Sequence, residues 1–311
     1  MTLTPEMLER LNELEQKYTA MGQNMQSYLE GLLYADYLTY WHYIQLDTLL
    51  NLQTPRTSIP DERIFIIYHQ ITELYFRLIL DAMEQVAKAE PSVVLLKRQL
   101  DRINRYFEQL VTSFDIMIDG MDKQEFLQFR MSLLPASGFQ SAQYRMIEIM
   151  STDFINLVHH SKRAELADEA EMANLYQHLY WKSGATELAT GKLTLTLKQF
   201  EEKYSRQFIE TAIAHKQNNL WQCYVNLSEA EQQDEELITL LKQHDFNTNV
   251  RWRLSHFRSA MRYLDNKPQT IAATGGTNWQ QYLPPKNQRV IFYPSLWSED
   301  ELENWGKSAK L

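Results

Sequence analysis

The longest stretch without glycine or proline is the feature that most limits the fold of this chain. No Gly or Pro occurs in the 76 residues between Gly191 and Pro268, or in the 30 residues from Asp61 to Glu90. The whole chain of 311 residues has nine of each. Sheet proteins need many turns, and Gly and Pro supply the backbone conformations of most turns. The scarcity of both residues therefore predicts long helices and an all-α fold.

A helix is predicted over residues 60–88, where apolar side chains recur every three or four positions. Pro60 suits the first turn of a helix, and Asp61 and Glu62 complement the positive end of its dipole. This spacing is typical of an amphipathic helix that packs against a core. The apolar face consists of Ile64, Ile67, Tyr68, Ile71, Leu74, Tyr75, Leu78, Ala82 and Val86.

Similar patterns predict further helices over 5–30, 92–119, 122–134, 139–160, 164–182, 196–224, 229–243 and 249–264. Pro135 must end one of them. Polar clusters at 215–219 and 245–249 predict bends, and the Pro- and Gly-rich residues 268–298 predict a loop-rich tail. We therefore expect a single large helical domain over 1–311 with a helical-bundle core.

Charge and cysteine usage exclude several classes of function. The net charge of -9 disfavours a nucleic-acid partner, because phosphates attract Lys and Arg. The single cysteine, Cys223, rules out a disulfide within the chain and fits a reducing, cytoplasmic location. The N-terminus lacks the pattern of a secretory signal, and no run of 18 apolar residues predicts a membrane span.

Two of the eight histidines lie among apolar helical residues. His69 follows Phe65 by four positions, and His256 follows Trp252 by four, so each pair shares a helix face. Such a histidine is either a hydrogen-bonded core residue or a metal ligand. The histidines show no HExxH spacing and no Glu-x-x-His set for a di-iron site. The metal that needs only one protein histidine is the iron of haem.

Arg130 is the third candidate, and it follows Phe126 by four positions. Its guanidinium group can bind a carboxylate through two parallel hydrogen bonds. The alternative is an ordinary ion pair with one of the 40 acidic residues. The loop Ala273-Thr-Gly-Gly-Thr277 is either a simple turn or a cover over a ligand, with its backbone N–H groups turned inward.

Four motifs in this order resemble the haem-dependent tryptophan 2,3-dioxygenase family, and they span most of the chain. The third motif, with its Ser-Gly-Phe-Gln-Ser core, is the most specific. The motifs are Tyr40-Trp-His-Tyr-Ile-Gln-Leu-Asp-Thr-Leu-Leu-Asn-Leu-Gln53, Asp61-Glu-Arg-Ile-Phe-Ile-Ile-Tyr-His-Gln-Ile-Thr-Glu-Leu74, Phe129-Arg-Met-Ser-Leu-Leu-Pro-Ala-Ser-Gly-Phe-Gln-Ser-Ala-Gln-Tyr-Arg-Met-Ile-Glu148 and Trp252-Arg-Leu-Ser-His256.

The resemblance implies a bundle that encloses a pocket for haem b. His256 would be the axial iron ligand with Trp252 beside it, and Ser137 and Gly138 would lie near the other face of the haem. His69 would be the catalytic residue, as a base or by orienting the indole N–H group. The substrate-binding residues would be Phe65, Arg130 as the carboxylate anchor, Tyr43, Leu133, Phe126 and Thr274.

The same resemblance implies an assembly. Tyr40, Tyr43 and Ile44 match a segment that enters the pocket of a neighbouring subunit, so residues 1–50 would contribute to that subunit in a homotetramer, a dimer of dimers. The expected small molecules are O2 and an aromatic amino acid.

Two departures from the family pattern keep other functions open. Phe126 stands where the family has a tyrosine, and Ala273 stands where it has a glycine. The first hypothesis is a dioxygenase that converts L-tryptophan to N-formylkynurenine. The alternatives are a haem-dependent monooxygenase of a substituted indole or aromatic amino acid, and a haem-binding sensor without turnover.

Overall fold

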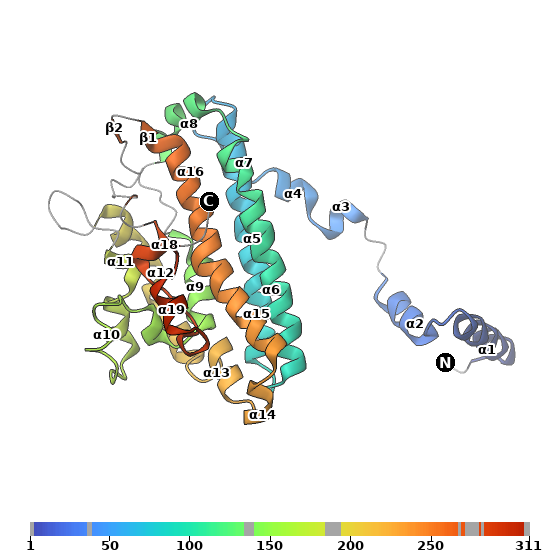
Figure 1. The fold of residues 1–311 in the computed structure, drawn as a ribbon. Coiled ribbons are helices and arrows are strands. Elements are labelled where there is room, and N and C mark those ends of the chain that lie inside the picture. Colours follow the sequence, from blue (N-terminus) through green and yellow to red (C-terminus); the bar gives the residue numbers. More distant parts are fainter. Residues whose placement is uncertain are drawn as a thin grey trace. The chain divides into compact units, whose positions relative to one another are not determined.

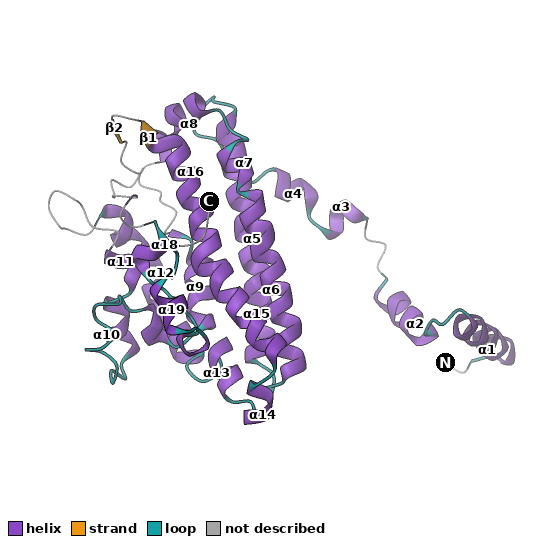
Figure 2. Cartoon of the chain, in the orientation of Figure 1, coloured by secondary structure: helices purple, strands orange, loops and turns teal. Residues whose placement is uncertain are grey.

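The chain divides into two compact units, which a computed structural model describes over residues 3–35, 39–133, 140–183, 194–266, 269–270, 280 and 283–307. The first unit is Met1–Thr54 and the second is Pro55–Leu311. Helices dominate both units (Figure 2), so the predicted all-α fold class is confirmed. No helix among the described residues is long and apolar enough to cross a membrane.

In its described residues, the N-terminal unit contains four helices, and none of them has a buried side chain. They are α1 (Pro5–Ala20), α2 (Met25–Tyr34), α3 (Tyr40–Tyr43) and α4 (Leu46–Leu50). The predicted helix 5–30 is interrupted because Gly22 has a positive φ of 67°, which ends α1. Asn24 then caps α2 by accepting a hydrogen bond from the backbone N–H of Gln26.

Long helices form the body of the second unit. Figure 1 shows α5 (Asp61–Ala87), α6 (Val93–Ser113), α15 (Glu235–Phe246) and α16 (Trp252–Leu264) running side by side. The predicted helix 60–88 is confirmed. Ser92 caps α6 by accepting a hydrogen bond from the backbone N–H of Leu95.

The helices α15 and α16 are joined without a break by a π-helix, η4 (Asn247–Arg251). The predicted bend at 245–249 is therefore wrong, although the helical geometry does change there. The bend predicted at 215–219 is confirmed, since α12 (Leu195–Ala214) ends before it and α13 (Leu220–Val225) begins after it. Asn219 caps α13 by accepting from the backbone N–H of Gln222.

Shorter helices complete the second unit. They are α7 (Asp115–Ile118), α8 (Lys123–Phe129), α9 (Ala142–Ser151), α10 (Met172–Gln177), α11 (Tyr180–Ser183), α14 (Glu229–Gln232), α18 (Pro285–Gln288) and α19 (Glu299–Glu303). Three 3-10 helices accompany them, η1 (Arg130–Leu133), η3 (Phe154–Leu157) and η5 (Pro294–Leu296). The only strands in the described part are β1 (Asp265–Asn266) and β2 (Gln269–Thr270), which pair antiparallel.

Two predicted helices are shorter than expected. The segment 139–160 is α-helical only to Ser151, because Thr152 is extended and its hydroxyl group donates to the carbonyl oxygen of Phe292. The segment 164–182 begins with turns, where the Glu169 carboxylate accepts from the backbone N–H of Glu171 at 2.8 Å. Such local hydrogen bonds compete with helix formation.

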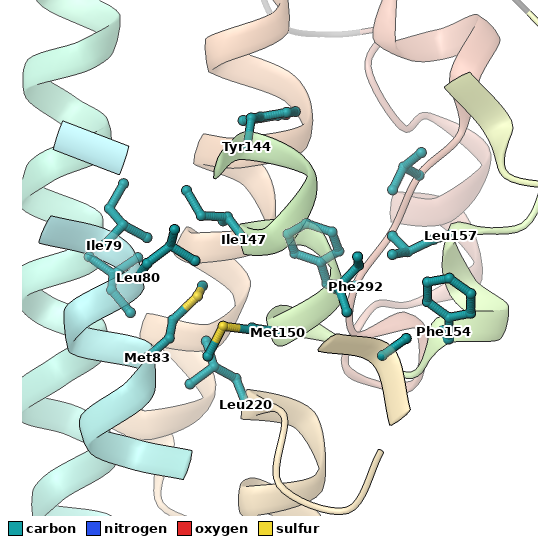
Figure 3. Packing of buried hydrophobic residues seen from close by; sticks show 14 of the residues in the cluster. Ile79, Leu80, Met83, Tyr144, Ile147, Met150, Phe154, Leu157, Leu220 and Phe292 are labelled. Carbon is teal, nitrogen blue, oxygen red and sulfur yellow. The ribbon is translucent and has the colours of Figure 1, made fainter. Parts of the chain in front are cut away.

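The core lies where α5, α9 and α13 meet the C-terminal segment. Figure 3 shows Leu80 and Met83 of α5 pointing toward Ile147 and Met150 of α9, with Leu220 close by. Each fully buried side chain of this size contributes about 1.5–3 kcal/mol to folding. This packing fixes the face of α5 that also carries Phe65 and His69 nearer its start.

Candidate functional site

The first wall of the candidate site is the N-terminal half of α5. The rings of Phe65 and His69 have centroids 4.1 Å apart, as the four-residue spacing predicts. His69 Nδ1 lies 2.7 Å from the carbonyl oxygen of Phe65. A carbonyl oxygen only accepts, so Nδ1 carries the hydrogen and Nε2 keeps its lone pair. His69 therefore offers an acceptor atom to a ligand.

The start of α5 is held by a buried carboxylate. Glu62 accepts hydrogen bonds from the backbone N–H groups of Arg56 (2.8 Å) and Thr57 (2.7 Å), and from the Thr57 hydroxyl group (2.6 Å). Burial acts to raise the pKa of Glu62, but the hydrogen bonds outweigh it and the pKa is lowered. The ionised carboxylate thus fixes the chain one turn before Phe65.

The second wall is formed by α16 and by Phe114, which follows α6. The Phe114 ring lies 4.8 Å from the Trp252 ring and 6.0 Å from the His256 ring, measured between centroids. Trp252 also meets Phe76 of α5 edge to face at 5.8 Å. His256 is thereby held half-buried against aromatic side chains.

The two histidines lie within electrostatic reach of each other. Desolvation and, as a smaller cause, the positive charge that His69 would carry together lower the pKa of His256 to about 4. Desolvation also lowers the pKa of His69, although part of its side chain is exposed. Both imidazoles are therefore neutral at pH 7, which is the form that binds metals.

These residues fit a haem. His256 supplies a neutral nitrogen donor, and within the described residues its ring makes no hydrogen bond that would compete for it. Phe114, Trp252 and Phe65 supply the apolar, aromatic walls that a porphyrin requires. No group of three or more His, Cys, Asp or Glu side chains that could hold a bare metal ion occurs in the described part of the chain.

Arg130 lies at the start of η1, directly after α8. Its side chain is buried, and desolvation lowers the pKa of its guanidinium group. The predicted helix 122–134 is α-helical only to Phe129, because its last turn tightens into η1, as helix ends often do. Leu133 lies half-buried at the end of the same turn.

Phe126 joins the two walls. Its ring centroid lies 6.3 Å from that of Phe65 and 4.4 Å from that of Tyr263 on α16. Phe129 also meets Phe65, at 5.8 Å. The structure therefore brings the predicted residues of 65–69, 126–133 and 252–256 into one region.

Some predicted residues are not part of this geometry. Ser137, Gly138 and Thr274 lie outside the described residues. Tyr40, Tyr43 and Ile44 belong to the N-terminal unit, where the Tyr43 side chain is exposed. The roles assigned to these residues stay predictions.

Sequence reasoning missed several neighbours of the site. Phe114 and Tyr263 carry no motif, and only the tertiary fold shows that they contact Trp252, His256 and Phe126. Arg253, between Trp252 and His256, is buried and bonded to Glu148 at 2.8 Å. Its position inside the fourth motif was the one sequence feature that could have marked Arg253 as a neighbour of the site.

A cavity of about 230 Å³ lies elsewhere in the second unit. No predicted site residue lines it, and one of its charged groups, Asp153, already accepts hydrogen bonds from Asn219 and Gln222. We therefore place the site at His69 and His256 and not in this cavity.

Comparison with known proteins identifies the family of the chain. A family model described as tryptophan 2,3-dioxygenase matches residues 23–174. The curated tryptophan 2,3-dioxygenase of Bradyrhizobium diazoefficiens is 31% identical over 269 residues, which cover 84% of this chain and 91% of that protein. The curated tryptophan 2,3-dioxygenase of Polaromonas sp. JS666 is 30% identical over 268 residues, with 84% and 86% covered. At this identity and coverage, the chain belongs to the tryptophan 2,3-dioxygenase family.

Proposed function

We propose that the chain opens the indole ring of L-tryptophan with O2 to give N-formylkynurenine, using haem b bound through His256. The observation that carries the proposal is the pairing of two neutral histidines, His69 and His256, between aromatic walls beside the buried Arg130. Family membership supports a haem-dependent oxidoreductase of this type. When bound, ferrous haem supplies an open position for O2.

Each of these side chains has a separate role in binding. Arg130 binds the substrate carboxylate, because a buried guanidinium group makes strong charge-assisted hydrogen bonds. Phe65, Phe126 and Leu133 pack against the indole. His69 Nε2 has a free lone pair and accepts the indole N–H. The resemblance alone supports Thr274 as a substrate-binding residue and Ser137 and Gly138 as cofactor-binding residues.

The direct test is single turnover with labelled oxygen. The haem-loaded protein is reduced without air and then mixed with 18O2 and L-tryptophan. We expect kynurenine-type absorbance and a product that carries two labelled oxygen atoms. One labelled atom would indicate a monooxygenase, and no turnover would leave only a haem-binding protein.

The Arg130→Ala variant tests the carboxylate anchor. Losing hydrogen bonds to a charged group costs about 1.5–3 kcal/mol, so KM for L-tryptophan should rise about 10- to 150-fold. The matched control is Arg206→Ala, which removes an exposed arginine paired with Glu210. An Arg130→Ala enzyme with unchanged KM would contradict the assignment.

We also infer a homotetramer in which residues 1–50 enter a neighbouring subunit, with Tyr43 reaching its pocket. The N-terminal unit supports this, because Leu33 and Tyr43 are 79% and 76% exposed. The α5 side chains Ile67, Ile71, Leu74 and Leu78 form a second exposed apolar stripe. Leu33→Glu should therefore lower the mass measured by light scattering, while Ile213→Glu on α12 should not.

The cytoplasm is the proposed location. Cys223 is free and buried, which suits a compartment that keeps thiols reduced.

A further inference from the structure

A buried ionic cluster lies on the helix that carries His256. Arg253 precedes His256 by three residues, so the two are neighbours on the surface of α16. Its Nη2 atom donates to Glu148 Oε1 and to the Tyr180 hydroxyl group, both at 2.8 Å. Arg145 on α9 donates to Glu148 Oε2 at 2.6 Å and to the same hydroxyl group at 2.7 Å. Arg145, Glu148 and Arg253 are all buried.

The cluster holds more positive than negative charge. Two guanidinium groups meet one carboxylate, and arginine stays protonated in proteins. Burial raises the pKa of Tyr144 and of Tyr180, so both phenols are neutral. Among the described residues, no acceptor reaches the buried Nε atom of Arg145.

The next carboxylate along the hydrogen bonds is that of Asp245. Asn249 links it to the cluster, donating to Asp245 and accepting from Arg253, both at 2.8 Å. Asp245 lies eight residues before Arg253, about 12 Å along the helix. Asp245 also accepts from the backbone N–H groups of Phe292 and Tyr293 and from the indole N–H of Trp297. Its charge therefore compensates the cluster only at a distance.

An unbalanced buried ion cluster is costly, because desolvation of the second cation is not repaid by a second anion. The excess charge lies about one helical turn from the proposed iron ligand, where a low dielectric keeps electrostatic effects strong. Positive charge near an iron ion disfavours the ferric state more than the ferrous state, since the ferric ion carries one more charge. Only the ferrous state binds O2.

We propose that Arg145, Glu148 and Arg253 form a positioning cluster for His256, which fixes the ligand-bearing face of α16 and raises the reduction potential of the iron bound there. The inference rests on the proposed haem function. The residues of the cluster are not among those proposed to bind substrate or cofactor, and they act through α16.

Two charge changes of opposite sign test the cluster in the haem-loaded, full-length protein. Arg145→Gln removes the excess positive charge, and Glu148→Gln removes the carboxylate that pairs with both arginines. In a spectroscopic redox titration at fixed potential, we expect Arg145→Gln to lower the ferrous-to-ferric ratio about tenfold, a shift of 59 mV. Glu148→Gln should raise the ratio. Shifts of the same sign in both variants, or no shift, would overturn the proposal.

Further variants separate charge from structure. Arg145→Lys keeps the charge but loses the forked hydrogen bonds, so its potential should match that of the unmodified protein. If Glu148→Gln does not fold, the comparison of Arg145→Gln with Arg145→Lys still tests the charge effect. Equal reduction potentials in these two variants would refute it. Arg206→Gln, in an exposed ion pair, should change nothing.

The outcome is separable from that of the proposed function. Failure of the unmodified protein to bind haem would reject the function itself. If the unmodified protein binds haem and turns over normally, but substitutions at 145 and 148 do not change the reduction potential, only the proposed role of the cluster is rejected.

Discussion

At the scale of single residues, Phe126 is the clearest difference from the family pattern. Its ring packs at a tilt against Tyr263 and lies near Phe65, so the family's hydroxyl group is missing from the wall next to Arg130. We expect Phe126→Tyr to lower KM for L-tryptophan about two- to tenfold, because one added hydrogen bond contributes about 0.5–1.5 kcal/mol. Steady-state kinetics would measure this change.

The control adds a hydroxyl group elsewhere. Phe246 is half-buried and packs near Trp305 in another cluster, so Phe246→Tyr should leave KM unchanged. An equal decrease of KM in both variants would mean that the added hydroxyl group acts on the stability of the protein and not at the site.

The sequence predicts which residues are neighbours on one helix better than it predicts which residues meet between helices. The four-residue spacing placed Phe65 beside His69, because neighbours on one helix face follow from helix geometry alone. Phe114 against His256 is a contact between residues 142 positions apart, and no periodicity indicates it. Such contacts depend on how helices pack.

At the scale of elements, the start of α5 depends on Glu62. We expect Glu62→Gln to lower the free energy of unfolding by about 1–3 kcal/mol, because three donors lose their charged acceptor. Urea unfolding would measure the loss. Glu210→Gln, in an exposed pair, should cost little.

The stabilisation of the folded state by Glu62 should also depend on pH. The folded-state pKa is below the ordinary value of 4.5, so the stabilisation is full above pH 4.5 and is lost as the pH falls through the lowered value. In Glu62→Gln this part of the acid response should disappear. An unchanged response would show that another group causes it.

The π-helix η4 sets the direction of His256. A π-helix holds one extra residue per turn, and such irregularities occur often at functional sites. Inserting one alanine directly after Arg253, where α-helical geometry has resumed, would rotate His256 by about 100° relative to α15. We expect haem binding, followed by absorption, to be lost while helical circular dichroism remains. Thr248→Ala, which keeps the register, should still bind haem.

Helices were predictable where Gly and Pro are scarce and apolar spacing is regular, as in 60–88. The π-helix was not, because residues 245–249 are polar and resemble a loop. They are buried polar groups instead: Asp245 and Asn249 bond to each other and to partners from α16 and the C-terminal segment. Only tertiary structure supplies these partners.

At the scale of the whole molecule, two adjacent buried groups give opposite pH responses. Burial lowers the pKa of His244 from 6.5 to about 3, so its contribution to stability is lost as pH falls from 6.5 to 3. Burial raises the pKa of Asp245 from 3.8 to about 6, so its contribution is lost as pH rises from 3.8 to 6. The two effects partly cancel between pH 4 and 6.

Single variants should separate the two effects. In His244→Gln the free energy of unfolding should fall as pH rises from 4 to 6, and in Asp245→Asn it should rise. Each slope is limited to about 1.4 kcal/mol per pH unit for one proton. Urea titrations at several pH values would measure the slopes. Slopes of the same sign in the two variants would contradict the opposite pKa shifts of His244 and Asp245.

The bonds of Asp245 have a consequence for biosynthesis. Its carboxylate is enclosed by donors from Phe292, Tyr293 and Trp297, which leave the ribosome about 50 residues later than Asp245 itself. A nascent chain that has not reached residue 292 lacks these donors, so the helix with His256 cannot take its final packing before residues 292–297 are made. Haem binding is thereby deferred until this segment has been synthesised, and chains truncated before residue 292 would compete poorly for haem.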